Sequence, residues 1–128
     1  TMCSQGIVEL YSNNHILEKQ EMTRYTEIYQ DFMNLVLLHY TTEHNVTFYA
    51  NQLGLTLSYF STSIKKAIGQ TPLEVITQII IMDAKALIKG TNQEIKNIAI
   101  ELGFNNLSFF NRFFRQHVGM TPQEYREC

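Results

Sequence analysis

The sequence has few of the features that mark disulfide scaffolds, metal centres, membrane spans or active sites. It contains only two cysteines, Cys3 and Cys128, and neither a CxxC pair nor a histidine spacing that suggests a metal site. Its longest apolar stretch, residues 75–82, is interrupted by Thr77 and Gln78 and is too short to cross a bilayer. No segment resembles a signal peptide, and no set of residues looks like a nucleophile with its base. These absences favour a reduced cytoplasmic protein that is not an enzyme and has no cofactor, metal ion or membrane partner.

Proline is also scarce, and its scarcity favours helices. Pro72 and Pro122 are the only two prolines, and the alternation of apolar and polar residues that marks strands is rare. With 45% hydrophobic residues the chain has enough apolar material for a core, and 128 residues are a usual length for one domain. We therefore predict an all-α domain.

An amphipathic helix is predicted at about residues 23–41. Its apolar stripe recurs at helical spacing and consists of Ile28, Phe32, Leu35, Val36 and His39. Residues 1–20 have no strong periodicity, so we interpret them as a linker or as the tail of a missing N-terminal domain. The folded domain is then expected to cover residues 21–128.

The charge is distributed unevenly along the chain. The net charge is −2, but residues 1–45 hold six acidic and two basic side chains, and residues 46–128 hold six acidic and eight basic ones. The two parts therefore carry −4 and +2. This asymmetry permits nucleic-acid binding by the C-terminal part without requiring it.

An internal repeat dominates the C-terminal part. Leu53-Gly54-Leu55 matches Leu102-Gly103-Phe104, which lie 49 residues later. Farther along, the offset is 50 residues, and the matching pairs are Ser58 and Ser108, Phe60 and Phe110, Lys65 and Arg115, Gly69 and Gly119, Thr71 and Thr121, Pro72 and Pro122, and Glu74 and Glu124. One supersecondary unit thus occurs twice, at about residues 45–70 and 93–120.

Each unit has the local signals of a helix, a tight turn and a second helix. Gly54 and Gly103 stand where the first helix ends on a residue of positive φ, which lets the chain reverse closely. Thr56 and Asn106 stand where an N-cap would start the second helix. Both units are therefore predicted to be helix-turn-helix units.

A long connecting helix is predicted between the units. Thr71 caps it, Pro72 takes the first helical position and Glu74 completes a capping box. The helix runs to about Lys89 and stops at Gly90, which gives roughly 17 residues and about 25 Å.

A further capping box is predicted at Thr91 and Glu94, at the start of the second unit. The predicted fold class is therefore all-α, with two helix-turn-helix units joined by a long connecting helix and preceded by an amphipathic helix.

The second helix of each unit has an apolar and a polar face. A projection at 100° per residue predicts core positions at Tyr59, Phe60, Ile64, Phe109, Phe110, Phe113 and Phe114. The polar faces consist of Ser58, Ser61, Thr62 and Lys65 in the first unit, and of Ser108, Asn111, Arg112 and Arg115 in the second. Small side chains permit close approach to the major groove, and Arg or Asn can read base edges there. Any surface helix has a polar face, and Lys65, Lys66 and Arg115 could be solvated charges only, but two matching faces favour DNA binding.

Residues 95–115, with residues 119–122 and Tyr125-Arg126, resemble the second helix-turn-helix of the AraC/XylS family of bacterial transcription regulators. Residues 49–69 are similar to that family's more variable first unit. The chain departs from many relatives in its apolar residues 79–81, where they carry Arg, and in a first recognition face without Arg or Gln.

The resemblance implies a seven-helix domain that sets two recognition helices in successive major grooves. It implies sequence-specific regulation of transcription at a promoter, by activation or sometimes repression. Its partners would be double-stranded DNA, in some members RNA polymerase, and an effector or dimerisation partner bound through a missing N-terminal domain. The expected base-facing residues are Ser58, Ser61, Thr62, Ser108, Asn111 and Arg112. The expected phosphate-facing residues are Lys65, Lys66, Lys96 and Arg115. The alternative is a helical protein-interaction module that keeps the fold without binding DNA.

Overall fold

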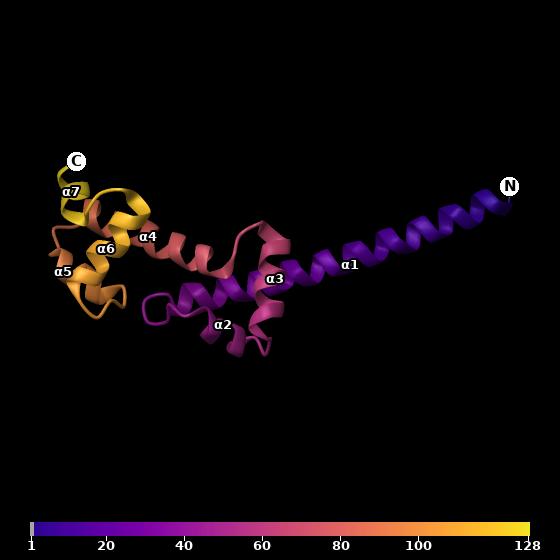
Figure 1. Cartoon of the computed structure of the whole chain (residues 1–128), viewed down its shortest axis with the longest axis horizontal. Helices are drawn as coiled ribbons and strands as arrows, with labels where there is room; N and C mark the ends of the chain where they lie inside the picture. The colour runs from indigo at the N-terminus through magenta and orange to yellow at the C-terminus, as the bar shows by residue number, and fades with distance from the viewer. Residues whose placement is uncertain (1) are drawn as a thin grey trace.

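The computed structural model describes residues 2–128, with side chains from Glu18 onward. This part of the chain forms seven helices and no strand (Figure 1). They are α1 (Met2–His39), α2 (Val46–Gln52), α3 (Leu57–Ile68), α4 (Pro72–Gly90), α5 (Ile95–Glu101), α6 (Leu107–Val118) and α7 (Pro122–Glu127). None of these helices combines the length and the apolar composition needed to span a membrane. The all-α fold class is confirmed.

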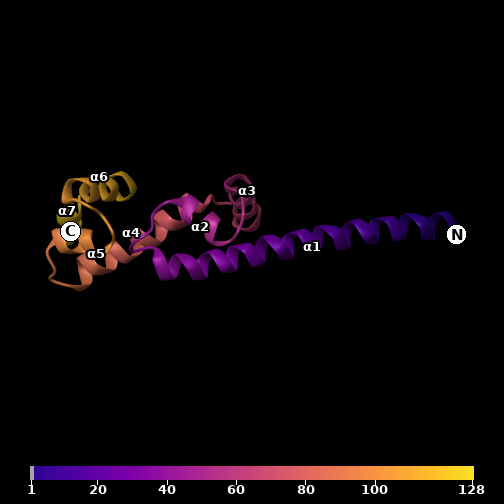
Figure 2. The ribbon, with the colours of Figure 1, turned by 90° about the horizontal axis from the view of Figure 1, so that it is seen from below.

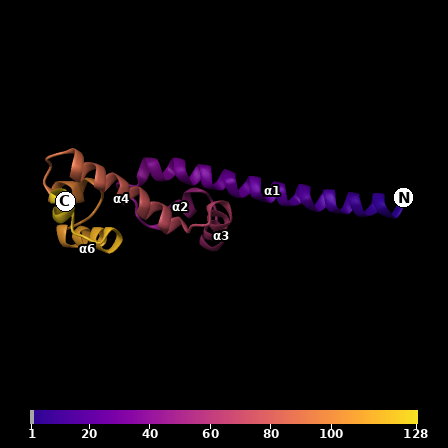
Figure 3. The same cartoon turned by 90° about the horizontal axis from the view of Figure 1, so that it is seen from above.

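The helices form two equivalent units around one connecting helix. α2 and α3 form the first unit, α5 and α6 form the second unit, and α4 passes from one to the other (Figure 1). The C-terminal part of α1 packs on α3 and α2, and α7 packs on α4. Figures 2 and 3 show α3 and α6 on one side of the molecule, α1 on the other and α4 between them. The predicted architecture of two joined units behind an amphipathic helix is thus confirmed.

The first helix is longer than the sequence predicted. α1 begins at Met2 rather than near residue 23, and its N-terminal part extends away from the rest of the molecule (Figure 1). Its buried stripe lies near the C-terminal end, at Ile28, Phe32 and Val36, whereas residues 18–24 are exposed. An apolar period reports the burial of one face rather than helix formation itself, so a helix that projects into solvent lacks this signal. That residues 1–20 are a linker or the tail of another domain stays a prediction.

Aromatic rings and α4 build a core that continues through both units. Phe32 of α1 packs edge-on against Tyr49 at 5.5 Å and Phe60 at 4.9 Å between ring centroids. In the second unit the ring of Phe104 lies 5.1 Å from that of Phe110. Each such side chain, when fully buried, contributes about 1.5–3 kcal/mol through removal of its apolar surface from water. The side chains that α4 buries between the units are Val75, Ile76, Ile80, Ala84 and Ile88.

The turns and caps confirm the internal repeat. Gly54 has φ 68° and Gly103 has φ 88°, as the tight turns require. The side chain of Thr56 accepts a hydrogen bond from the backbone N–H of residue 59, and that of Asn106 accepts one from residue 109. Thr71 likewise accepts from the N–H of residue 74 at the start of α4. The start of each second helix is therefore fixed by the same local chemistry.

The capping box predicted at Thr91 and Glu94 is wrong. Glu94 occupies the N-cap of α5 but its side chain makes no capping hydrogen bond. Thr91 instead closes α4, because its hydroxyl donates to the carbonyl oxygen of Leu87 at 2.6 Å. Since α5 begins only at Ile95, Thr91 lies too far ahead of that helix to cap it.

A loop of residues 40–44, here called the bridging loop, ties the first unit to the second at a place that the sequence did not indicate. The hydroxyl of Tyr40 donates a 2.6 Å hydrogen bond to a carboxylate oxygen of Asp83 on α4. Nε2 of His44 lies 2.8 Å from the carbonyl oxygen of Leu102, which can only accept, so that nitrogen carries the proton. The hydrogen bond to Asp83, with a smaller effect of burial, raises the pKa of Tyr40 to about 12. The two units are therefore held in a fixed relation by this loop as well as by α4.

Candidate nucleic-acid interface

The two second helices, α3 and α6, have matching frames, which here means the same length and the same type of ending. Each has 12 residues, and each ends at a glycine in the left-handed region, Gly69 with φ 74° and Gly119 with φ 95°. The N–H of each glycine donates at 2.8 Å to a carbonyl oxygen of the last turn, that of Lys65 or Arg115. Because the frames match and the helices lie on one side of the molecule (Figures 2 and 3), their two polar faces together are the candidate surface.

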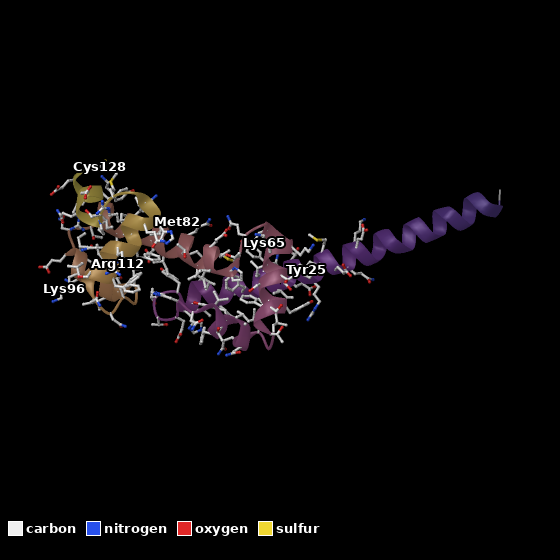
Figure 4. The ribbon with its side chains drawn as sticks, in the orientation of Figure 1. Tyr25, Lys65, Met82, Lys96, Arg112 and Cys128 are labelled. Carbon is white, nitrogen blue, oxygen red and sulfur yellow. The ribbon has the colours of Figure 1, made fainter. Side chains whose placement is uncertain are left out.

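On α6 the predicted polar face is mostly exposed. Ser108, Arg112 and Arg115 are exposed, and Asn111 is half-buried. Figure 4 labels Arg112 on the second unit and Lys96 on α5, at the outer edge of that unit. This unit therefore combines a guanidinium and an amide, the two groups best suited to recognise guanine and adenine, with cations around them.

On α3 the predicted polar face carries smaller groups. Ser58 and Thr62 are exposed, and Ser61 is half-buried. Lys65, labelled in Figure 4, and Lys66 are exposed in the last turn. The first unit thus presents hydroxyls near the start of its helix and two ammonium groups near its end, and it has no planar side chain that could bond a base with two hydrogen bonds.

Two aromatic residues that the sequence placed in the core are exposed. Phe110 and Phe114 are fully buried as predicted and Phe113 is partly buried, but Phe109 is 58% exposed and Tyr59 is 40% exposed. Both lie about 100° from the serine that precedes them, at the margin of the apolar arc. A projection gives the direction of a side chain but not which neighbouring element covers it, so no local signal could have settled the two positions.

Three cations of the C-terminal part hold α7 on α4 and take no part in the candidate surface. Nε of Arg126 donates to the carbonyl oxygen of Ile88 at 2.9 Å. Lys85 and Lys89 lie over the ring of Tyr125, at 6.0 and 5.1 Å from its centroid. The five other cations of this part are those predicted for DNA: Lys65, Lys66, Lys96, Arg112 and Arg115, all exposed.

The histidines of the described side chains also have structural places. His39 packs edge-on against Phe48 at 5.2 Å, and His117 packs on Phe113 at 4.8 Å. His44 belongs to the bridging loop. Within residues 18–128 no three His, Cys, Asp or Glu side chains come together as a group that could hold a metal ion.

Comparisons with protein families match a model described as a helix-turn-helix domain to residues 49–127. Among curated proteins, the transcriptional regulator YobQ of Bacillus subtilis is 35% identical over 69 residues, 54% of this chain and 29% of its own. The regulator ExsA of Pseudomonas aeruginosa is 28% identical over 109 residues, 85% of this chain and 38% of its own. The transcriptional activator RhaS of Escherichia coli is 25% identical over 116 residues, 88% of this chain and 42% of its own. The chain thus spans less than half the length of these relatives.

Solved structures share the fold. The C-terminal domain of the two-component response regulator yesN from Fusobacterium nucleatum aligns with a TM-score of 0.70 at 26% identity, over 74% of this chain and 93% of that one. The DNA-binding domain of AdpA, solved in complex with a target DNA, aligns with a TM-score of 0.69 at 19% identity, over 77% of this chain and 88% of that one.

Proposed function

Because the chain belongs to the AraC/XylS family of helix-turn-helix transcription regulators, we propose that it binds duplex DNA sequence-specifically with α3 and α6 in successive major grooves. In this proposal it regulates transcription at a promoter, as an activator. One observation supports it above the others: two helices with matching frames lie on one side of the molecule, in a relation fixed by α4 and the bridging loop.

Successive major grooves on one face of B-DNA are about 34 Å and 10–10.5 base pairs apart. A protein with two recognition helices can use both grooves only if the helices keep a fixed separation and face the same way. α4, with 19 residues at 1.5 Å each, spans about 28 Å along its axis. A link of this length and stiffness is of the scale that two successive grooves require.

The residue roles proposed for the second unit follow from side-chain chemistry. Arg112 bonds guanine with two hydrogen bonds, Asn111 bonds adenine, and Ser108 contacts either base at close approach. Arg115, one turn along the helix, and Lys96 on α5 neutralise phosphates. These contacts divide the unit into a part that reads sequence and a part that fixes the position of the helix.

In the first unit, Ser58, Ser61 and Thr62 are proposed to face the bases and Lys65 and Lys66 the phosphates. Hydroxyls can donate to or accept from several bases, so they discriminate less than a bidentate arginine does. We therefore expect the first unit to contribute affinity and the second unit to contribute most of the sequence preference.

The experiment is a salt titration of DNA binding by the whole chain. A preferred duplex is first selected from a random pool. Its dissociation constant and that of a scrambled duplex are then measured by fluorescence anisotropy at salt concentrations from about 50 to about 300 mM, where counterion release is measurable. If the five cations neutralise about five phosphates, log K falls against log salt with a slope of about −4 to −5 on both duplexes.

A combined Lys65→Ala and Arg115→Ala variant should reduce that slope by about 2 units. The combined Lys85→Ala and Lys89→Ala variant is the matched control, because it removes two positive charges that lie over Tyr125 instead of on the candidate surface. A slope near zero, or equal changes in the two variants, would overturn DNA binding by this face and favour the protein-interaction module.

The relatives' greater length supports a wider proposal about the whole regulator. We propose that an effector-sensing or dimerisation domain adjoins this domain through α1, that RNA polymerase is a second partner, and that the regulator acts in the bacterial cytoplasm. Co-purification of RNA polymerase on promoter DNA loaded with the full-length regulator tests the second of these. No retention beyond that of bare promoter DNA would count against it.

A further inference from the structure

Each recognition helix begins with the same exposed pattern of an apolar residue, a serine and an aromatic residue. Leu57 and Leu107 are the first residues of α3 and α6 and are 48% and 37% exposed. Tyr59 and Phe109 are the third residues and are 40% and 58% exposed. These large apolar side chains leave surface in water that folding has not removed and that a contact made on binding would cover.

The two aromatic positions differ in what surrounds them. Tyr59 lines a shallow pocket together with residues 20, 21, 24 and 25 of α1, so α1 flanks its ring. Phe109 has the core ring of Phe104 on one side, with 6.3 Å between centroids and a 39° tilt, and is the more exposed of the two. Of the two rings, that of Phe109 therefore offers more surface to a ligand.

The position of Phe109 is fixed before any ligand arrives. Its backbone N–H donates a 2.7 Å hydrogen bond to the Oδ1 atom of Asn106, which anchors the first turn of α6. Its ring leans on that of Phe104, which in turn lies 5.1 Å from the rings of Phe110 and Phe113. A side chain held in this way loses little conformational entropy when it is covered.

Phe109 also borders the proposed base-reading residues. Ser108 precedes it, and Arg112 follows three residues later, so the Cβ atoms of Phe109 and Arg112 are neighbours about 5–6 Å apart on the helix surface. The N-terminal residues of a recognition helix are the ones that contact base edges in the major groove. The ring therefore extends the reading face of α6 on the side of Arg112.

We propose that Phe109 is a specificity-determining residue that reads the C5-methyl group of a thymine next to the base pair bound by Arg112. A phenyl ring neither donates nor accepts a conventional hydrogen bond, and the thymine methyl is the apolar group that base pairs present in the major groove. This inference rests on the proposed DNA binding and names one base contact within it.

The test replaces thymines of the selected duplex one at a time with deoxyuridine, which removes the methyl group and leaves every hydrogen-bonding group in place. For the unaltered chain, one replacement in the half-site of the second unit should weaken binding about fourfold, the equivalent of one methyl group removed from water. Phe109→Ala should weaken binding to the thymine duplex and should bind the thymine and deoxyuridine duplexes equally.

Ile100→Ala is the matched control, because Ile100 is 59% exposed on α5 and lies outside both recognition helices. It should keep the fourfold methyl effect. Phe109→Gln serves as a second variant that keeps the length of the side chain and favours the helix, so that a loss of the methyl effect does not depend on the alanine variant alone. Melting temperatures within a few degrees of the unaltered chain show that both variants are folded.

The outcomes separate this inference from the function on which it rests. If the chain prefers a duplex but no deoxyuridine replacement weakens binding, or if Phe109→Ala retains the methyl effect, Phe109 does not read thymine and DNA binding stands. If the selected half-site of the second unit holds no thymine, Phe109 likewise does not read thymine, and DNA binding again stands. If the chain prefers no duplex at all, the proposed function itself is overturned.

Discussion

Gly54 and Gly103 hold the same place in the two turns, and a comparison of their alanine variants isolates one contact between the units. Both glycines have positive φ, 68° and 88°. A Cβ atom built on Gly54 meets no heavy atom within 4 Å. A Cβ atom built on Gly103 overlaps the carbonyl oxygen of Thr41 in the bridging loop and lies 3.1 Å from Nε2 of His44. The two substitutions therefore share the same backbone strain and differ in the steric overlap.

The expected magnitudes follow from these two terms. An alanine in the left-handed region costs about 1–2 kcal/mol, partly offset by about 0.4–1 kcal/mol because the unfolded chain loses freedom. Gly54→Ala should therefore lower the free energy of unfolding by about 1 kcal/mol. Gly103→Ala carries the same cost and also displaces the bridging loop, at about 1–3 kcal/mol for the overlap and about 0.5–1.5 kcal/mol for the hydrogen bond between His44 and Leu102. The difference between the variants should be roughly 2–4 kcal/mol.

Urea unfolding, followed by circular dichroism at the helical minimum near about 222 nm, measures the stability of both variants on the same scale. At a slope of about 2 kcal/mol per molar urea, the two midpoints should differ by about 1–2 M. Equal midpoints would refute the argument, because the overlap of the added Cβ atom with Thr41 would then cost no stability. A Gly103→Ala variant as stable as the unaltered chain would further mean that Thr41 does not contact this turn.

Three more predictions concern base reading, the bridging loop and the spacing of the two units. Arg112→Ala should reduce discrimination by about 1–3 kcal/mol at one base pair, whereas Lys65→Ala should weaken binding to selected and random duplexes alike; equal losses for Arg112→Ala on both would show that it reads no base. The pKa of Tyr40 is raised from 10.0 to about 12, so its contribution to stability is complete below pH 10 and is lost as the pH rises towards 12. Tyr40→Phe should lose less stability over that interval, and parallel curves would contradict the bond to Asp83. Insertion of about 5 base pairs between the half-sites should lower affinity towards that of one unit, and insertion of a full turn should also lower it because α4 is stiff; unchanged affinity with the half-turn insertion would mean that only one unit reads DNA.

The parts of the fold that the sequence predicted are those with local signals. The turns at Gly54 and Gly103 and the caps at Thr56 and Asn106 follow from residues within a few positions of each feature, and the repeat shows each signal twice. The exposed polar faces of α3 and α6 followed from helical periodicity in the same way. The functional roles assigned to those faces stay predictions.

The parts that the sequence did not predict depend on contacts between distant residues. The bridging loop joins Tyr40 to Asp83 across 43 positions and His44 to Leu102 across 58, and no local pattern marks either pair. The exposure of Phe109 depends on the absence of a covering element, which a helical projection cannot report. The capping error at Thr91 arose because a threonine can close one helix as readily as it can start another, and only the observed start of α5 separates the two.

The repeat conserves the frame of the two units but not the groups that would meet DNA, and this difference bears on how the units would work together. Caps, turn glycines and closing glycines recur at equivalent positions. On α6, however, Arg112 and Phe109 stand where α3 has Thr62 and Tyr59, whose ring is flanked by α1.

If base pairs are read mainly by α6, the second unit sets the register on the duplex. Because α4 and the bridging loop fix the relation of the units, the register of α3 then follows without base contacts of its own. The first unit would add phosphate contacts through Lys65 and Lys66, which strengthen binding on any sequence at that distance. A rigid link thus converts sequence-independent contacts of one unit into affinity for the sites that the other unit has selected.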